Sequence, residues 1–581
     1  MKKLFTARLN SIFCQRSKSG GLAALLGIAT LAVAPSVASA ADVTFERLLN
    51  PEPHNWLMVH HDYNSQRYST LDQINKSNIK NLKLKFAIAI GGASPNEALE
   101  VTPLVEDGFM YVVDGWGAVY KIDVRSGNHG RTLWKMDPGI KRYARLRGVA
   151  LWGNLVISTT GKDGRVIATD KETGKLVWDT NLSDNPELEL SAAPLALKDD
   201  IIIGGSGGDQ GVRDWIASLD PKTGSLKWKT YSIPAPGEPG SETWKDKNEA
   251  WKTGGGAFYV TGSYDPHTNL TIWGSGNPVP GYDAAYRPGD NLFTASAIAF
   301  NVATGKMQWY FQYTPNDSRD YDETGVHMLI DTKVDGKDRK IVTHPGRNGF
   351  NYTFDRVTGE FLNAGQYVSK VTWTRGIDPK TGKPLDYDPT KDLQTYAEPP
   401  NVTQNKVTRR LCPDISGGNN FWPPAYSRIT GMVYIPSVEA CVDLTPDDKA
   451  HVKGNFAGGT YINPEPVKSS IVVVDPATSQ QKMRKELPYP NSAGVLSTAG
   501  GVIVTALLDG TIYAFDDKTL DELWSINVGT GFNAPPMTYS VDGKQYIAIA
   551  SGLWRNARNK LARSPEMKNF SNATMIFVFG L

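Results

Sequence analysis

Cysteine is scarce in this sequence, and the few cysteines are widely spaced. Only 3 of the 581 residues are cysteine, and no Cys-x-x-Cys-His motif occurs. The chain therefore lacks the attachment site of a c-type haem and the paired cysteines of common zinc modules. A charge excess is also missing, since 62 basic residues stand against 60 acidic ones. No basic face for nucleic acid is expected from this balance.

Long hydrophobic runs are absent as well, apart from one near the N-terminus. There, Lys2 and Lys3 precede an apolar run at 21–34 and the small residues Ala38-Ser39-Ala40. This pattern predicts a signal peptide over 1–40, cleaved after Ala40, with export to the periplasm. The alternative is a membrane anchor, but a run of about 14 residues is short for a bilayer. No membrane span is expected in the mature chain.

Two cysteines remain after the predicted cleavage. Cys14 leaves with the signal peptide, and Cys412 and Cys441 are retained. An even pair in an oxidising compartment predicts a disulfide. The alternative, a metal-binding pair, lacks nearby histidines.

A repeat runs along the mature chain. The pattern Asp-x-x-Thr-Gly-x-x-x-Trp occurs at 170–178 and 220–228, recurs with Asn first at 301–309, and is degraded from 123, 355, 475 and 516. Each copy predicts a strand, a tight turn and a strand. Radial four-stranded blades explain this spacing best. We predict one all-β domain over 41–581, an eight-bladed β-propeller with Trp-docking repeats. Residues 575–579 would close its ring by pairing with an N-terminal strand. Two separate β-sandwiches are the alternative.

Acidic and glycine-rich segments supply the candidate site. Asp320 and Asp322 stand two residues apart on an extended segment, so their side chains point the same way. Together they predict oxygen ligands for a hard cation, the alternative being a solvated acidic loop. The glycine-rich turn at 204–209 would cradle an anionic ligand with its N–H groups and ends in Asp209. Asn277 offers an amide oxygen.

Several longer motifs carry a family resemblance. They are SGGDQGVR (206–213), WGSGNP (273–278), TPNDSRDYD (314–322), THPGRNG (343–349) and CPDISGGNN (412–420). With them the mature chain resembles the quinoprotein alcohol dehydrogenases, which use pyrroloquinoline quinone (PQQ) and a metal ion. Methanol dehydrogenase large subunits and quinoprotein ethanol dehydrogenases belong to this family.

The resemblance implies a role for individual residues. Asp320 resembles the catalytic base, which also touches the metal, and Arg347 resembles the arginine that hydrogen-bonds the quinone oxygens. Asp209 and Asn277 match further metal ligands, and Cys412 with Cys441 matches a family disulfide. The positions that resemble contacts to PQQ are Glu100, Arg147, Ser191, Ser206, Gly207, Gly208, Tyr259, Arg347 and Asn420.

Three positions depart from the family pattern. The adjacent cysteine pair that usually covers PQQ is missing, and residues 141–144 stand in its place. The usual stacking tryptophan is Tyr259, and the usual metal-binding glutamate is Asp209, one methylene shorter. Asp322 resembles the carboxylate of the lanthanide-dependent branch, so a lanthanide is favoured as the metal, with calcium as the alternative.

The resemblance therefore predicts oxidation of an alcohol to an aldehyde or ketone. Because the chain has no haem motif, electrons would pass to a periplasmic cytochrome c or another acceptor. A PQQ-dependent sugar or aldehyde dehydrogenase and a non-catalytic propeller scaffold are the alternatives. Ser492 lies where relatives tend to have a tryptophan, which favours a bulkier substrate than methanol. The oligomeric state is open, with a homodimer as one option.

Overall fold

The computed structural model describes residues 42–91, 97–397, 407–447, 457–463, 465–564, 566–567 and 571–581. By its contacts the chain divides into residues 1–39 and 40–581, and only the second unit is described below. The predicted signal peptide lies outside the described residues. Within these ranges, no helix has the length and apolar character needed to cross a bilayer.

Strands dominate the described residues, and five sheets follow one another from β3 to β22. The first two consist of β3 (Leu104–Glu106), β4 (Phe109–Val113), β5 (Val119–Asp123) and β6 (Arg131–Met136), then β7 (Ala150–Trp152), β8 (Leu155–Thr159), β9 (Arg165–Asp170) and β10 (Leu176–Asn181). The next two consist of β11 (Leu195–Ala196), β12 (Ile201–Gly204), β13 (Trp215–Leu219) and β14 (Leu226–Tyr231), then β15 (Ser263–Asp265), β16 (Leu270–Gly274), β17 (Ser296–Asn301) and β18 (Met307–Gln312). The fifth consists of β19 (Met328–Val334), β20 (Lys337–Pro345), β21 (Phe350–Asp355) and β22 (Phe361–Gln366).

Three further sheets contain the C-terminal part of the chain. One has β24 (Ala425–Ser427), β25 (Met432–Glu439), β28 (Lys468–Asp475) and β29 (Gln480–Leu487). The next has β30 (Val495–Thr498), β31 (Val502–Ala506), β32 (Thr511–Asp516) and β33 (Glu522–Asn527), with β1 (Tyr68–Ser69) added in parallel. The last has β34 (Met537–Val541), β35 (Lys544–Ala550), β36 (Met575–Gly580) and β2 (Lys83–Ala89). Successive sheets of this kind, with little helix, form a β-propeller.

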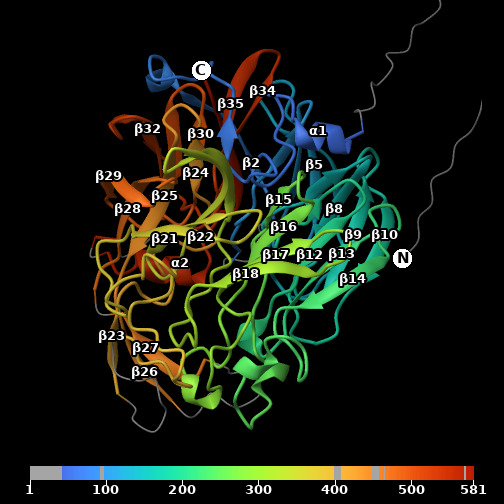
Figure 1. The fold of residues 1–581 in the computed structure, drawn as a ribbon. Coiled ribbons are helices and arrows are strands. Elements are labelled where there is room, and N and C mark those ends of the chain that lie inside the picture. Colours follow the sequence, from blue (N-terminus) through green and yellow to red (C-terminus); the bar gives the residue numbers. More distant parts are fainter. Residues whose placement is uncertain are drawn as a thin grey trace, which may run out of the picture. The chain divides into compact units, whose positions relative to one another are not determined.

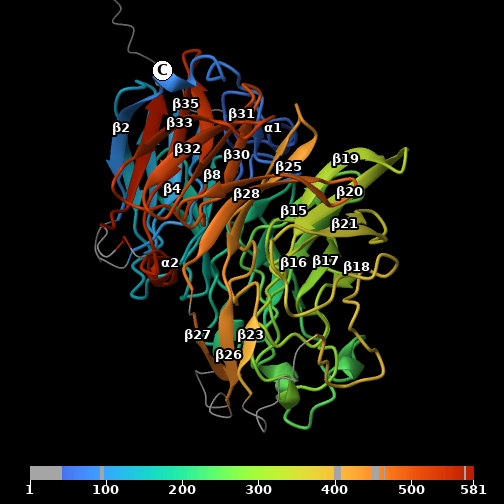
Figure 2. The same ribbon diagram turned by 90° about the vertical axis from the view of Figure 1, so that its left-hand side faces the viewer.

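The ends of the described chain meet in that last sheet. β36 pairs with β2 in antiparallel register, from Lys83 opposite Gly580 to Ala89 opposite Met575. Figures 1 and 2 show β2 and β35 in the same part of the fold, and the strand order places β36 between them. The predicted pairing of the final strand is therefore confirmed. The described residues form eight sheets of four or five strands, the number that the predicted eight blades require.

A small ninth sheet is inserted in the sixth sheet. It contains β23 (Arg409–Leu411), β26 (Val442–Pro446) and β27 (Gly459–Ile462). Figures 1 and 2 both place it away from the other sheets. The short helices are α1 (Phe45–Leu49), α2 (Arg555–Leu561) and the 3-10 turns Ile79–Asn81, Gly208–Gln210, Ser241–Thr243, Ala250–Lys252 and Ala284–Tyr286. The long repeat gap from 355 to 475 was expected to contain an unmarked sheet, and this prediction is wrong. The copies at 355 and 475 belong to the consecutive fifth and sixth sheets, the gap is filled by the insertion, and the sheet without a repeat copy is the last one.

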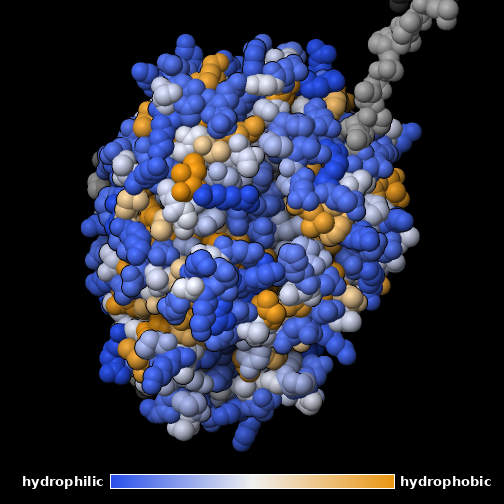
Figure 3. Space-filling view, turned by 45° about the horizontal axis from the view of Figure 1, so that its top comes forward, coloured by the Kyte–Doolittle hydropathy of each residue, from blue (hydrophilic) through white to orange (hydrophobic). Residues whose placement is uncertain are grey.

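Burial within each sheet decreases from the inner strands to the outermost strand. In the third sheet β12 and β13 are buried throughout, whereas every position of β14 is exposed or half-buried. The inner strands are therefore uniformly apolar because both of their faces are covered by neighbouring sheets. On the face in Figure 3, hydrophobic side chains are scattered among hydrophilic ones.

The repeated tryptophans connect each of the first four sheets to the following one. The Trp178 indole donates a hydrogen bond to the Pro221 carbonyl at 3.1 Å, and its ring covers Gly224 in the next Asp-x-x-Thr-Gly turn. The tryptophans at 134, 228 and 309 make the same contact with the turns at 171–174, 302–305 and 356–359. Each repeat therefore contributes a tryptophan to one contact and a glycine to the next.

Replacing Gly224 with alanine should destabilise the protein strongly. Gly224 has a φ of +70°, and an added Cβ would lie 2.5 Å from the Trp178 ring. Gly543 is a matched control, because its φ is +71° and nothing lies within 4 Å of an added Cβ. We expect Gly543→Ala to cost about 1 kcal/mol and Gly224→Ala about 2–4 kcal/mol, measured by urea unfolding. Equal losses would show that the docking contact contributes nothing.

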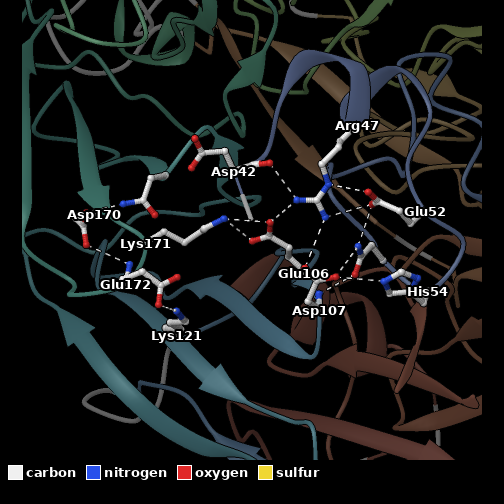
Figure 4. Close-up of polar contacts among 12 residues, drawn as sticks. Asp42, Arg47, Glu52, His54, Glu106, Asp107, Lys121, Asp170, Lys171 and Glu172 are labelled. Atoms are coloured by element: carbon white, nitrogen blue, oxygen red, sulfur yellow. Dashed lines mark hydrogen bonds and ion pairs between the residues drawn. The ribbon is translucent and has the colours of Figure 1, made fainter. Parts of the chain in front are cut away.

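Buried ion pairs attach the N-terminal segment to the first two sheets (Figure 4). Glu106 at the end of β3 is fully buried and accepts from Lys171 Nζ at 2.7 Å and from Arg47 Nη1 of α1 at 2.7 Å. Arg47 also binds Glu52 at 2.7 Å. Because each buried charge has a partner, removing any one of them would leave an uncompensated charge.

Two buried histidines should make the protein sensitive to acid. Burial lowers the pKa of His60 and of His61 to about 3 each. The unfolded chain binds these protons near pH 6.5, so the stability is complete above that pH and is lost as pH falls toward 3. By pH 5 each histidine should cost about 2 kcal/mol. Urea unfolding at pH 7 and pH 5 measures how much of the unfolding free energy is lost on acidification. We expect this loss to be smaller by about that amount in His60→Gln than in the wild-type protein, and an equal loss in both would contradict the assignment.

Candidate functional site

Seven of the eight large sheets contribute one end to a common cavity. Its volume is about 390 Å³. Seven of its lining residues lie a few positions before the first strand of a sheet. They are Arg147 before β7, Ser191 before β11, Tyr259 before β15, Asp322 before β19, Asn420 before β24, Ser492 before β30 and Asn533 before β34. The ends of second strands lie at the same end of an antiparallel sheet. They contribute Asp209 after β12, Asn277 after β16 and Arg347 after β20.

Nearly all of the residues predicted from the sequence line this cavity. They are Arg147, Ser191, Ser206, Gly207, Gly208, Asp209, Tyr259, Asn277, Asp320, Asp322, Arg347 and Asn420. Glu100 is the exception among the predicted residues. It is fully buried, binds Arg147 at 2.6 Å and lines a separate small cavity that Arg147 also lines.

Arg347 is the centre of the acidic side of the cavity. Its Nη2 donates to Asp322 Oδ2 at 2.6 Å and to the Tyr259 hydroxyl at 2.8 Å, and its Nη1 lies 3.5 Å from Asp320 Oδ1. The surrounding carboxylates raise the pKa of this guanidinium, so it stays charged. Its buried Nε has no partner among the described residues.

Three carboxylates line the cavity together with this arginine. Burial raises the pKa of Asp320 well above its usual range, and Arg347 opposes that shift. Enclosure in the cavity and the neighbouring Asp322 raise the pKa of Asp209 to about 6. Asp322 Oδ1 accepts from the Asn277 backbone N–H at 2.7 Å. Like charges gathered in this way are expected where a cation binds or a proton is transferred.

The side chains near Arg347 offer oxygen atoms, which hard cations prefer as ligands. These oxygens do not converge on one common position for an ion. The set is Asp209, Asp320, Asp322 and the Asn277 amide, whose nitrogen donates to the Pro278 carbonyl at 3.0 Å. Among the described residues, no three His, Cys, Asp or Glu side chains already form a metal-binding group. Binding one ion with all three carboxylates would therefore require side-chain rotation.

The opposite side of the cavity is rich in basic and hydroxyl groups. Arg147 donates to Ser191 Oγ at 3.2 Å, and Ser191 Oγ lies 3.3 Å from Ser206 Oγ. The guanidinium of Arg147 lies 5.0 Å from the centre of the Tyr259 ring, and its Nε has no hydrogen-bond partner among the described residues. This group suits a planar ligand that carries carboxylates.

The predicted disulfide is present and anchors one wall. Cys412 and Cys441 are bonded, with their Cα atoms 4.5 Å apart. The loop that follows Cys412 supplies Ile415, Ser416 and Asn420 to the cavity. The segment 141–144 does not line the cavity. Its Tyr143 ring packs against Trp116, with 5.6 Å between the ring centres.

Sequence reasoning missed several lining residues, namely Arg145, Glu189, Gln210, Asn533, Trp554, Ala557 and Lys560. Asn533 could have been predicted, because it lies shortly before the first strand of its sheet, β34, as Asn420 lies shortly before β24. Trp554 and Lys560 belong to the segment around α2, which has no counterpart in the other repeats. The guanidinium of Arg145 lies 4.3 Å from the Trp554 ring centre.

Comparison with known proteins gives the same family as the motifs. The family described as PQQ "Glucose/ethanol/alcohol dehydrogenase, beta-propeller domain" matches residues 56–364 and 470–547. Quinoprotein alcohol dehydrogenase PedH of Pseudomonas putida is 33% identical, with 89% of each chain covered. Quinohemoprotein alcohol dehydrogenase of Comamonas testosteroni is 34% identical over 94% of this chain and 79% of its own.

Solved structures are similar over the same extent. Quinohemoprotein alcohol dehydrogenase ADHIIG of Pseudomonas putida superposes with a TM-score of 0.84 at 30% identity, over 93% of this chain and 82% of that one. A europium-containing methanol dehydrogenase superposes with a TM-score of 0.82 at 28% identity, over 92% and 100%. On these matches and the site described above, the chain belongs to the family of PQQ-dependent quinoprotein alcohol dehydrogenases.

Proposed function

We propose that this protein is a periplasmic dehydrogenase that oxidises an alcohol to an aldehyde or ketone with PQQ and one bound cation. Electrons would leave to a cytochrome c or a similar carrier. One observation supports this proposal most strongly. Asp320, Arg347 and three further oxygen-bearing side chains line the same cavity as the Arg147–Ser191–Ser206 group. A proton acceptor, a cation site and an anion site thus lie in one enclosure.

The residues present suit PQQ, a planar quinone with three carboxylates. Arg147, Ser191 and Ser206 would hold carboxylates, and the Tyr259 ring would lie against one face of the planar group. The unpartnered Nε atoms of Arg147 and Arg347 support this placement, because buried donors are normally satisfied. When bound, PQQ supplies the acceptor for an electron pair, and the cation, held by Asp209, Asn277, Asp320 and Asp322, supplies positive charge beside it.

Asp320 would remove the proton from the substrate hydroxyl. Its side chain is about one-fifth exposed, which leaves an oxygen accessible from the cavity. Burial disfavours its charged form, so the carboxylate has a strong tendency to take up a proton. Arg347 Nη1 donates to the Asp320 backbone carbonyl at 2.6 Å and thereby fixes the position of the base. The same guanidinium would stabilise negative charge that develops in the cavity.

Dye-linked oxidation of a panel of alcohols tests the proposal. The protein is expressed with export, loaded with PQQ and assayed with calcium or lanthanum, with protein lacking PQQ as the control. We expect oxidation that depends on both PQQ and a cation, and aldehyde or ketone as the product. Absence of turnover under every condition, in protein that still binds PQQ, would contradict the proposed activity.

A further inference from the structure

A lysine on a short C-terminal helix lines the cavity. The helix is α2, and Trp554, Ala557 and Lys560 all contribute to the cavity wall. Residues three apart on a helix share one face, so these three side chains form a continuous strip. Leu561 and Ala557 belong to a buried apolar cluster with Leu508 and Leu553. The packing of that cluster fixes α2, and therefore Lys560, against the cavity.

Lys560 is a buried cation without an ion-paired or hydrogen-bonded anion. It is only 7% exposed, and its Nζ lies 5.1 Å from the centre of the Trp422 ring. Across the described residues it has neither a hydrogen bond nor an ion pair, and burial lowers its pKa to about 8. A buried ammonium normally has a charged or hydrogen-bonding partner, because desolvation is costly. Asp414 is close enough to oppose the lowered pKa but forms no ion pair with Lys560, so an anionic ligand in the cavity would be its first direct partner.

Two aromatic rings separate Lys560 from the group that suits the cofactor's carboxylates. Arg147 lies 4.9 Å from the Phe421 ring centre, whereas Lys560 lies over the Trp422 ring. The two rings meet edge to face, with 5.2 Å between their centres. The positive charge of Arg347 is close enough to lower the pKa of Lys560 further. Lys560 lines the same cavity as Arg347 and Asp320.

We propose that Lys560 binds the carboxylate of the substrate, so that the preferred alcohols are hydroxycarboxylates. This inference rests on the proposed function of the same cavity. The hydroxyl would lie at Asp320 and the carboxylate at Lys560. Bound PQQ would accept the hydrogen of the hydroxyl carbon together with its electron pair, Asp320 would take the hydroxyl proton, and the product would be the corresponding oxocarboxylate. The substrate carboxylate is unchanged by the reaction.

A matched substrate series tests this assignment in the PQQ- and cation-loaded protein. The series is the ω-hydroxycarboxylates from hydroxypropanoate to hydroxyhexanoate, each paired with its uncharged amide. We expect Lys560→Met to lower kcat/KM by about 10- to 100-fold for the best hydroxycarboxylate and to change that of its amide by less than about threefold. Lys560→Arg should retain most of the preference for the carboxylate. Lys175→Met, at an exposed turn, should change neither value.

Binding measurements separate the inference from the proposed activity. Butanoate, which has no hydroxyl group, should bind the loaded wild-type protein in calorimetry and bind Lys560→Met at least about tenfold more weakly. If no alcohol is oxidised but this difference remains, the proposed function fails and the carboxylate site stands. Equal losses for carboxylate and amide substrates would overturn the assignment. Weaker PQQ binding in Lys560→Met, with unchanged substrate preference, would instead assign Lys560 to the cofactor.

Discussion

Replacing Asp320 with asparagine is expected to lower turnover by about a hundred- to ten-thousandfold while PQQ binding is retained. General-base catalysis contributes rate factors of this size, and the amide cannot accept the hydroxyl proton. Asparagine is also the substitution that the backbone tolerates best. Asp320 has a φ of +62°, a left-handed conformation that aspartate and asparagine adopt more readily than other residues with a side chain.

The comparison needs two measurements on the same preparations. Turnover is followed with an electron-accepting dye, and PQQ affinity is followed by titration against its absorbance. Asp338→Asn serves as a control, because Asp338 is an exposed aspartate whose partner is Lys333. Turnover of Asp320→Asn within about tenfold of the wild-type value would remove Asp320 from the role of base.

Lanthanum should restore activity to PQQ-loaded, metal-free protein, and calcium should not. Asp209, Asp320 and Asp322 supply three negative charges, and a trivalent ion gains more from them than a divalent ion does. Asp322 is the decisive residue of the three. Its Oδ2 already accepts from Arg347 and Tyr259, so a trivalent ion would have to compete with a guanidinium for that oxygen.

The variant Asp322→Asn tests this preference. Removing one charged ligand should weaken lanthanum binding by about a hundredfold and reduce the difference between the two ions. Affinity is measured by the cation concentration that restores half of the activity, with Asp338→Asn again as the control. Full reactivation of the wild-type protein by calcium alone would contradict the preference for a lanthanide.

The fold could be predicted from the sequence because the repeat carries its own contacts. Asp, Gly and Trp in one copy define a turn and a docking ring, so the sheets were identified from local sequence. The partner of each tryptophan could not be identified in the same way. Trp178 covers Gly224 of the following repeat, a contact that only the arrangement of neighbouring sheets creates. The inserted sheet of β23, β26 and β27 has no repeat signature, and it was not predicted.

The site residues that stand in family motifs could be predicted from the sequence. The site residues on the helix α2 could not. Asp320, Asp322 and Arg347 stand in such motifs, and all three line the cavity. Glu100 binds Arg147 at 2.6 Å and does not itself line the cavity, so its contact with the cofactor stays a prediction. Lys560 was missed because it shares a face with Trp554 only if the segment is helical. The strand repeat does not predict a helix there.

The most direct test is to mix PQQ-loaded protein with its best alcohol in the absence of oxygen and any electron acceptor, and to follow the PQQ spectrum. The account predicts that the alcohol reduces the bound PQQ in wild-type protein within a single turnover, with one equivalent of aldehyde or ketone formed. In Asp320→Asn the spectrum should stay that of the oxidised cofactor over the same time. If no alcohol changed the spectrum of bound PQQ in the wild-type protein, the cavity would not be an alcohol-oxidising site and the account would be wrong.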